Sequence, residues 1–184
     1  MKFILASSSP RRQELIEYLQ IDYIVDASNI EEVIDESISN EDLVMSLAYQ
    51  KAEDVSHRHP NNYVLGFDTL VILDGKPLGK PKSREEAFKM LQSLSNKKHL
   101  VLTGCSIVKG DYKELFYDHA EVIFNEMSEQ EISDYLDTNE PFDKAGAYGI
   151  QGYGAKFIRY IKGDYYSVMG MPIQKIYNKI RDLK

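Results

Sequence analysis

The stretch that most constrains the fold is Tyr63–Leu73, which reads YVLGFDTLVIL. A short run of apolar and β-branched residues is typical of a strand, and the Asp74-Gly75 pair directly after it favours a hairpin turn. Asp68 lies in the middle of this run. A buried charge is costly unless it is paired, bound to a metal or solvated in a cleft, so Asp68 is a candidate functional residue. From the residues alone, a structural aspartate bonded to backbone amides is an equally good interpretation.

The elements around this strand predict an α/β fold. Helices and strands alternate at first, paired strands dominate the middle, and a helix ends the chain, which favours a mixed, twisted sheet with helices on its faces. The helix starts carry capping signals. Further strands are expected at 3–6, 23–25, 99–108, 115–124 and 155–161, and helix N-caps at Ser9, Asn40, Ser83 and Ser128.

The first turn of the chain reads SSSPRR and leads from an apolar run into a helix. Ser9 is suited to cap that helix, and Pro10 suits its first turn. Serine hydroxyls, backbone N–H groups and the guanidinium groups of Arg11 and Arg12 therefore gather at one place, which favours an anion such as phosphate. A capped helix with two solvated arginines explains the tetrapeptide SPRR equally well on its own.

Three other segments carry candidate ligands for a phosphorylated compound. Lys80 lies in a Gly-Lys-Pro turn, Lys51 lies on the predicted helix after Asn40, and Gln151 lies in the glycine-rich passage 143–154. Solvated lysines and a glycine-rich corner between strands are the simpler alternatives. The chain contains no G-x-x-x-x-G-K-[ST] sequence, and GAYGIQG has the wrong spacing for a dinucleotide fingerprint.

Composition narrows the class of protein. The chain has 184 residues, a formal net charge of −7 and no basic stripe, so we expect no nucleic-acid partner. No apolar stretch approaches the roughly 20 residues that span a bilayer, so we expect no membrane span. A single cysteine, Cys105, excludes an internal disulfide framework, and the lack of a signal peptide predicts a cytoplasmic setting. With few histidines, a bound metal would be an oxygen-ligated ion such as Mg²⁺ or Mn²⁺, held by acids such as Asp68 and Glu32. Together these parts suit a site that binds polyphosphate and directs water at phosphorus.

In order along the chain, the segments SSSPRRQEL, GFDTLV, LGKP, DKAGAYGIQG and YYSVMGMP resemble the Maf family of nucleoside triphosphate pyrophosphatases. The resemblance covers essentially the whole chain and implies one domain over residues 1–184. It implies an inosine-triphosphatase-like (Maf/Ham1) architecture with two lobes around a cleft. The implied reaction is divalent-metal-dependent hydrolysis between the α- and β-phosphates, which releases a nucleoside monophosphate and pyrophosphate.

The resemblance also assigns roles. Asp68 takes the position of the proton acceptor and metal ligand, while Arg11, Thr69 and Gln151 mark the branch that acts on dTTP and UTP. A glutamine amide can meet the neutral O4/N3–H edge of thymine or uracil. The remaining implied phosphate and metal positions are Ser7, Arg12, Glu32, Lys51 and Lys80. Two positions depart from the family pattern, because Phe67 and Met171 replace alanine and leucine. The bulkier Phe67 is expected to narrow the pocket.

The leading hypothesis is therefore a house-cleaning hydrolase for dTTP, UTP or modified pyrimidine triphosphates. Two alternatives stay open: a pyrophosphatase for another modified nucleotide, and a non-catalytic nucleotide-binding regulator of septum formation. A homodimer is expected from the family resemblance alone.

Overall fold

The computed structural model describes residues 2–183 and contains a seven-stranded sheet with helices around it. The strand order is β2-β1-β3-β5-β6-β7, and β4 pairs with β3. The strands are β1 (Lys2–Leu5), β2 (Asp22–Val25), β3 (Tyr63–Leu73), β4 (Lys76–Leu78), β5 (Lys98–Lys109), β6 (Tyr112–Phe124) and β7 (Ile158–Gly163). The α-helices are α1 (Pro10–Glu17), α2 (Asn40–Ser56), α3 (Arg84–Leu94), α4 (Glu129–Leu136), α5 (Tyr165–Met169) and α6 (Ile173–Arg181). Short 3₁₀ helices are η1 (Glu140–Asp143), η2 (Ala145–Ala147) and η3 (Tyr153–Phe157).

The chain divides into two compact units. Unit 1 comprises residues 1–69, 103–118 and 170–184, and unit 2 comprises residues 70–102 and 119–169. Strands β3, β5 and β6 each contribute residues to both units. The mixed sheet with flanking helices is confirmed, and the two units agree with the two predicted lobes. The predicted cleft stays a prediction.

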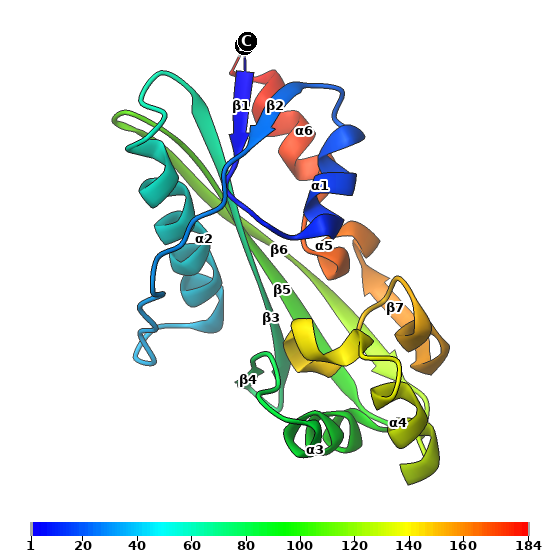
Figure 1. The fold of residues 1–184 in the computed structure, drawn as a ribbon. Helices are drawn as coiled ribbons and strands as arrows, with labels where there is room; N and C mark the ends of the chain where they lie inside the picture. The colour runs from blue at the N-terminus through cyan, green and yellow to red at the C-terminus, as the bar shows by residue number, and fades with distance from the viewer. Residues whose placement is uncertain (1, 184) are drawn as a thin grey trace. The chain divides into compact units, whose positions relative to one another are not determined.

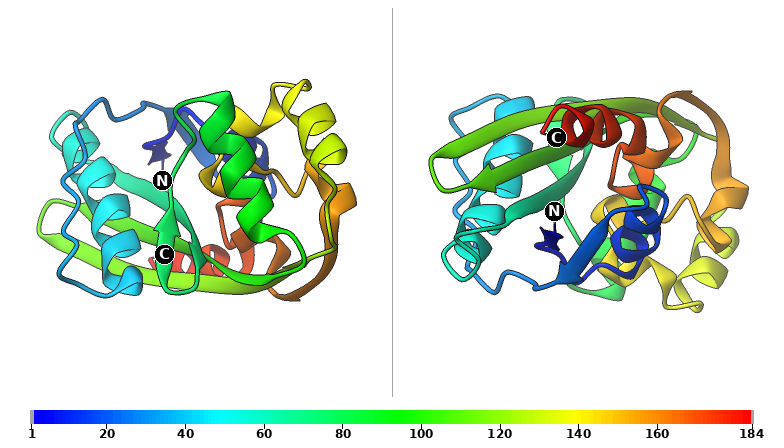
Figure 2. Two further views of the ribbon diagram at one scale, coloured as in Figure 1. Left: turned by 90° about the horizontal axis from the view of Figure 1, so that it is seen from below. Right: turned by 90° about the horizontal axis from the view of Figure 1, so that it is seen from above.

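Unit 1 is built on parallel pairing, in which Phe3 of β1 lies opposite both Tyr23 of β2 and Tyr63 of β3. Such pairing needs crossover connections, and helices α1 and α2 supply them. Helix α2 lies on one side of these strands, while α1 and α6 lie on the other (Figure 1). Figure 2 shows the same separation from below and from above. Ala52 and Val55 of α2 pack on Ile4 in a wholly buried cluster, which fixes this helix against the sheet.

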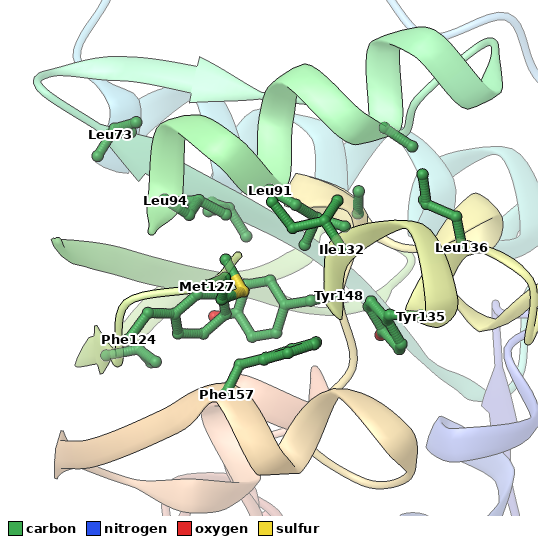
Figure 3. Close-up of a cluster of buried hydrophobic side chains, with 14 of the residues drawn as sticks. Leu73, Leu91, Leu94, Phe124, Met127, Ile132, Tyr135, Leu136, Tyr148 and Phe157 are labelled. Carbon is green, nitrogen blue, oxygen red and sulfur yellow. The ribbon is translucent and has the colours of Figure 1, made fainter. Parts of the chain in front are cut away.

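Unit 2 has a core rich in aromatic side chains (Figure 3). Leu91 and Leu94 of α3 and Ile132 of α4 pack over it. Beneath them, the rings of Phe124 and Tyr148 meet edge to face with centroids 4.7 Å apart, a geometry that aromatic pairs favour. Strand β7 pairs antiparallel with β6 at the edge of this unit.

Most predicted elements are confirmed, and two details are wrong. The N-cap of α2 is Ser39, whose hydroxyl accepts the Asp42 N–H, rather than Asn40. The strand expected at 155–161 begins only at Ile158, because Tyr153–Phe157 forms η3, whose first amides bond to a carboxylate instead of a strand. Ser9 is the N-cap residue of α1, but its side chain makes no capping bond. Among the described residues, no helix is both long and apolar enough to cross a membrane.

Candidate functional site

Two clusters of polar side chains in unit 1 contain most of the residues that the sequence singled out. The first cluster surrounds Arg12 and includes Ser7 and Thr69. The second surrounds Lys51 and includes Glu32 and Asp68. Asp68 and Thr69 are neighbours on β3, and successive side chains of a strand point to opposite faces. The pleat of this one strand therefore serves both clusters.

The turn between β1 and α1 positions the first cluster. Ser7 is buried, and its hydroxyl oxygen accepts the backbone N–H of Ser9 at 3.3 Å. The Ser7 hydroxyl therefore holds the turn just before α1, while the Ser9 side chain makes no capping bond. Pro10 occupies the first helical turn as predicted, and Leu15 and Ile16 anchor the helix in the core.

Arg12 extends from α1 and is held by three neutral acceptors. Its Nε donates to the carbonyl oxygen of Gly170 at 2.9 Å, and its Nη2 donates to Thr69 Oγ1 at 3.1 Å. Its Nη1 donates to Ser7 Oγ at 3.4 Å. A guanidinium group has five N–H donors. Among the described residues these three bonds are those that Arg12 donates, which leaves one N–H on each of Nη1 and Nη2. That pair suits bidentate binding of a phosphate.

Phe67, together with two residues that sequence reasoning missed, Gly170 and Thr103, completes this cluster. Gly170 has a φ of +107°, and a Cβ there would lie 3.2 Å from Thr69 Oγ1 and 3.3 Å from Arg12 Nε, so glycine allows the close approach. Thr103 Oγ1 lies 3.0 Å from Thr69 Oγ1 and fixes that hydroxyl. Phe67 is wholly buried, and its ring lies 5.8 Å from Arg12 Cζ. The expected narrowing of the pocket by Phe67 stays a prediction.

Burial lowers the pKa of Arg12, and the negative charge of Asp68 acts in the opposite direction. A guanidinium stays protonated in proteins even so. Arg12 is therefore a fixed positive charge whose bonded partners carry none of their own.

The second cluster is an ion-paired triad. Lys51 Nζ on α2 contacts Asp68 Oδ1 on β3 and lies 2.9 Å from Glu32 Oε1. The side chain of Asp68 is 14% exposed and that of Glu32 is 38% exposed. Pairing explains how Asp68 is tolerated in an apolar strand. The interpretation of Asp68 as bonded only to backbone amides is wrong, because its partner is an ammonium group.

Gln50 places Glu32 in this triad, although the segment before α2 has no regular secondary structure. Gln50 Oε1 accepts the Val33 N–H at 2.8 Å, and its Nε2 donates to the Val33 carbonyl at 2.9 Å. The residue next to Glu32 is therefore fixed to the helix that carries Lys51. Its position next to Lys51 is a weak signal that sequence reasoning could have used to find Gln50.

The other predicted site residues lie elsewhere. Arg11 is half-buried on α1. Lys80 and Gln151 are exposed and belong to unit 2, and their roles stay predictions. Cys105 is buried, and burial raises the pKa of its thiol, which agrees with a packing role. Among residues 2–183, no group of three histidine, cysteine, aspartate or glutamate side chains could hold a metal.

The comparisons with known proteins agree on family and fold. The family model described as "Maf-like protein" matches residues 2–183. A Bacillus cytotoxicus protein named dTTP/UTP pyrophosphatase is 50% identical over 100% of this chain and 94% of its own length. A Geobacillus protein of the same name is 46% identical over 99% and 98%. In structure, the chain resembles the Staphylococcus aureus Ham1 protein over the full length of both, with a TM-score of 0.56 at 16% identity. A Coxiella burnetii HAM1 protein gives a TM-score of 0.55 at 16% identity and 99% coverage of both.

Proposed function

The chain belongs to the Maf family, and from this membership we propose that it is a nucleoside triphosphate pyrophosphatase that hydrolyses dTTP and UTP. The products are the nucleoside monophosphate and pyrophosphate. The names of relatives that are about half identical over the whole chain support the substrates. By the family resemblance, Arg11, Thr69 and Gln151 are the residues expected to set the preference for dTTP and UTP.

The observation that carries the proposal is the pairing of a fixed anion grip with a carboxylate in the same unit. Arg12 keeps two N–H groups for phosphate oxygens, while Asp68 is a carboxylate held by Lys51 in an otherwise apolar strand. Phosphoryl transfer needs little from a protein beyond positioning and charge stabilisation. The Arg12 cluster supplies the anion grip, and the Lys51 cluster supplies the positioned carboxylate.

In the proposed reaction, Arg12 binds phosphate oxygens and holds the triphosphate in place, with Arg11 of the same unit adding positive charge. Asp68 orients a water molecule and accepts its proton as the water oxygen bonds to the α-phosphorus. The bond from that phosphorus to the bridging oxygen then breaks, and pyrophosphate leaves with the bonding electrons. Lys51 adjoins Asp68 and is placed to neutralise charge on the phosphates once it leaves the carboxylate.

Glu32 and Asp68 are the residues that would hold Mg²⁺ or Mn²⁺. Their carboxylates already converge on one positive charge, the Lys51 ammonium, so the donor set fits a hard cation. Magnesium usually takes one or two carboxylates and completes its shell with water and substrate phosphates. When bound, the ion would screen phosphate charge and polarise the phosphoryl oxygens.

The proposal also covers the setting of the enzyme. We expect both units to act as one catalytic domain, in the cytoplasm, where it removes unwanted pyrimidine triphosphates. The homodimer expected from the family stays part of this proposal.

A nucleotide panel tests the function directly. Purified protein is incubated with natural and modified triphosphates and either Mg²⁺ or Mn²⁺, and pyrophosphate and orthophosphate are measured separately. We expect pyrophosphate from dTTP and UTP. Orthophosphate as the only product, or no turnover of any pyrimidine triphosphate, would overturn the proposal. Preference for another base would support the modified-nucleotide alternative, and binding without turnover would support the regulator.

A further inference from the structure

In unit 2 the six-residue segment 149–154, the Gln151 loop, is fastened at both ends by two side chains outside it. At its first end, the Gly149 N–H donates to the Tyr135 hydroxyl at 3.1 Å. At its last end, the N–H groups of Tyr153 and Gly154 donate to the carboxylate of Glu140 at 2.7 and 3.0 Å. Gln151 lies between these attachment points and is exposed.

The two fastening side chains are themselves joined. The Tyr135 hydroxyl donates to Glu140 Oε1 at 2.8 Å, so one hydroxyl accepts from the first end of the loop and donates to the acceptor of the other end. Tyr135 is wholly buried on α4, where its ring packs edge to face on Phe157 with centroids 5.3 Å apart. The network is therefore anchored in the core of unit 2.

The backbone of the loop is shaped to this network. Gly152 has a φ of +129°, and a Cβ there would lie 2.4 Å from Glu140 Oε2. Glycine at this position lets the carboxylate approach the chain. Charge-assisted bonds from backbone N–H groups to a carboxylate are among the stronger hydrogen bonds in proteins, so this end of the loop has little freedom.

We propose that Tyr135 and Glu140 are positioning residues, which hold the Gln151 loop in the conformation that recognises the pyrimidine base. The inference rests on the proposed function, since it takes the Gln151 amide as the group that meets the base edge. An exposed glutamine on a free glycine-rich loop would have many conformations, and ordering them on binding would lower affinity. Because the network fixes the loop before the nucleotide binds, a base whose edge matches the amide binds without that loss of affinity.

The test compares binding rather than turnover. The α,β-methylene analogues of UTP and ATP resist cleavage at the α–β linkage, and titration calorimetry measures their affinities for the full chain. We expect Glu140→Gln to weaken binding of the UTP analogue about tenfold and binding of the ATP analogue by less than about twofold. Tyr135→Phe, which keeps the packed ring, should weaken the UTP analogue about threefold. Glu126→Gln is the matched control, because Glu126 is exposed in the same unit and lies outside the network.

A double-mutant cycle separates positioning from general damage. If Glu140 acts through Gln151, Glu140→Gln adds no further loss of base preference to Gln151→Ala. If the two substitutions instead reduce base preference independently, so that their fold losses multiply in the double variant, the inference is overturned. Hydrogen exchange gives an independent readout. The exchange rates of the Tyr153 and Gly154 amides should rise at least about tenfold in Glu140→Gln and stay the same in Glu126→Gln. Unchanged exchange in Glu140→Gln would also overturn it.

The outcomes distinguish this inference from the proposed function. Preference for the UTP analogue without turnover of UTP would contradict only the proposed catalysis. Turnover of UTP with normal base preference in both Glu140→Gln and Tyr135→Phe would contradict only the positioning role. Should Glu140→Gln unfold, as monitored by circular dichroism, Tyr135→Phe decides the question by the same measurements.

Discussion

Arg12 and Lys51 are two half-buried cations on elements that pack against β3, yet their partners differ in kind. Arg12 donates to two hydroxyls and a carbonyl, all neutral. Lys51 is paired with the carboxylates of Asp68 and Glu32. Neutral acceptors fix a guanidinium without cancelling its charge, so the Arg12 cluster still attracts an anion. One ammonium against two carboxylates leaves an excess of one negative charge, so the Lys51 cluster suits a further cation.

This difference assigns separate tasks to the two clusters. The Arg12 cluster is expected to control substrate affinity, and the Lys51 cluster is expected to control the chemical step. Substitutions in the two clusters should therefore divide between KM and kcat.

The largest effect is expected for Asp68→Asn. The amide keeps the size of the side chain but is a far weaker proton acceptor, so kcat should fall at least ~10²-fold while nucleotide binding persists. Single-turnover assays and calorimetry with α,β-methylene-UTP measure the two quantities. Near-normal turnover would remove Asp68 from the mechanism.

Arg12→Lys should have the next largest effect. Lysine keeps the charge but cannot bond to Gly170 and Thr69 while offering two N–H groups to phosphate. Losing charge-assisted bonds of about 1.5–3 kcal/mol should raise KM roughly 10- to 100-fold with little change in kcat. Steady-state kinetics with UTP checks this. A kcat effect equal to that of Asp68→Asn would contradict the division of tasks.

Gly170→Ala tests whether the position of Arg12 matters as well as its charge. The new methyl group would crowd Thr69 and Arg12 at a φ that favours glycine. We expect KM to rise about three- to tenfold and the melting temperature to fall by about 2–4 °C, as for a destabilisation of about 1 kcal/mol. Unchanged KM at a lowered melting temperature would assign Gly170 to stability alone.

Glu32→Gln should change metal dependence more than rate. Glu32 is the more exposed carboxylate, and removing its charge weakens one ligand while Asp68 remains. We expect the Mg²⁺ concentration for half-maximal activity to rise about fivefold, with activity at saturating Mg²⁺ within about twofold of the wild type. A magnesium titration at fixed UTP measures both. An unchanged half-maximal concentration would remove Glu32 from the proposed metal site.

Phe67→Leu should have the smallest effect. It keeps an apolar side chain in the core but removes the ring over which the Arg12 guanidinium lies. Loss of about 0.5–1 kcal/mol of cation–π attraction should raise KM about two- to fivefold. A larger change in kcat than in KM would place Phe67 outside the Arg12 cluster.

The sequence predicted what local signals determine. Alternating and apolar runs identified β3 at its observed bounds, and Ser128 caps α4 as expected, in a capping box with Glu131. Asp68 was found because a charge within an apolar strand needs an explanation. Lys51 was one of the candidate phosphate ligands, but its contact with Asp68 became visible only in the fold.

The residues that were missed have partners far away in the chain. The Arg12–Gly170 bond joins residues 158 positions apart, and no local pattern encodes it. Glu140 was overlooked because its acceptor role depends on the amides of Tyr153 and Gly154, which propensity placed near a strand start. Such contacts depend on tertiary structure, which overrides local preference.

The most direct measurement is a side-by-side comparison of Arg12→Lys and Asp68→Asn, in which each variant is assayed for α,β-methylene-UTP affinity and for single-turnover UTP hydrolysis. The predicted result is a crossover: Arg12→Lys loses affinity and keeps its hydrolysis rate at saturation, while Asp68→Asn keeps affinity and loses hydrolysis. Equal losses of both quantities in both variants would contradict the division between an anion grip and a catalytic carboxylate.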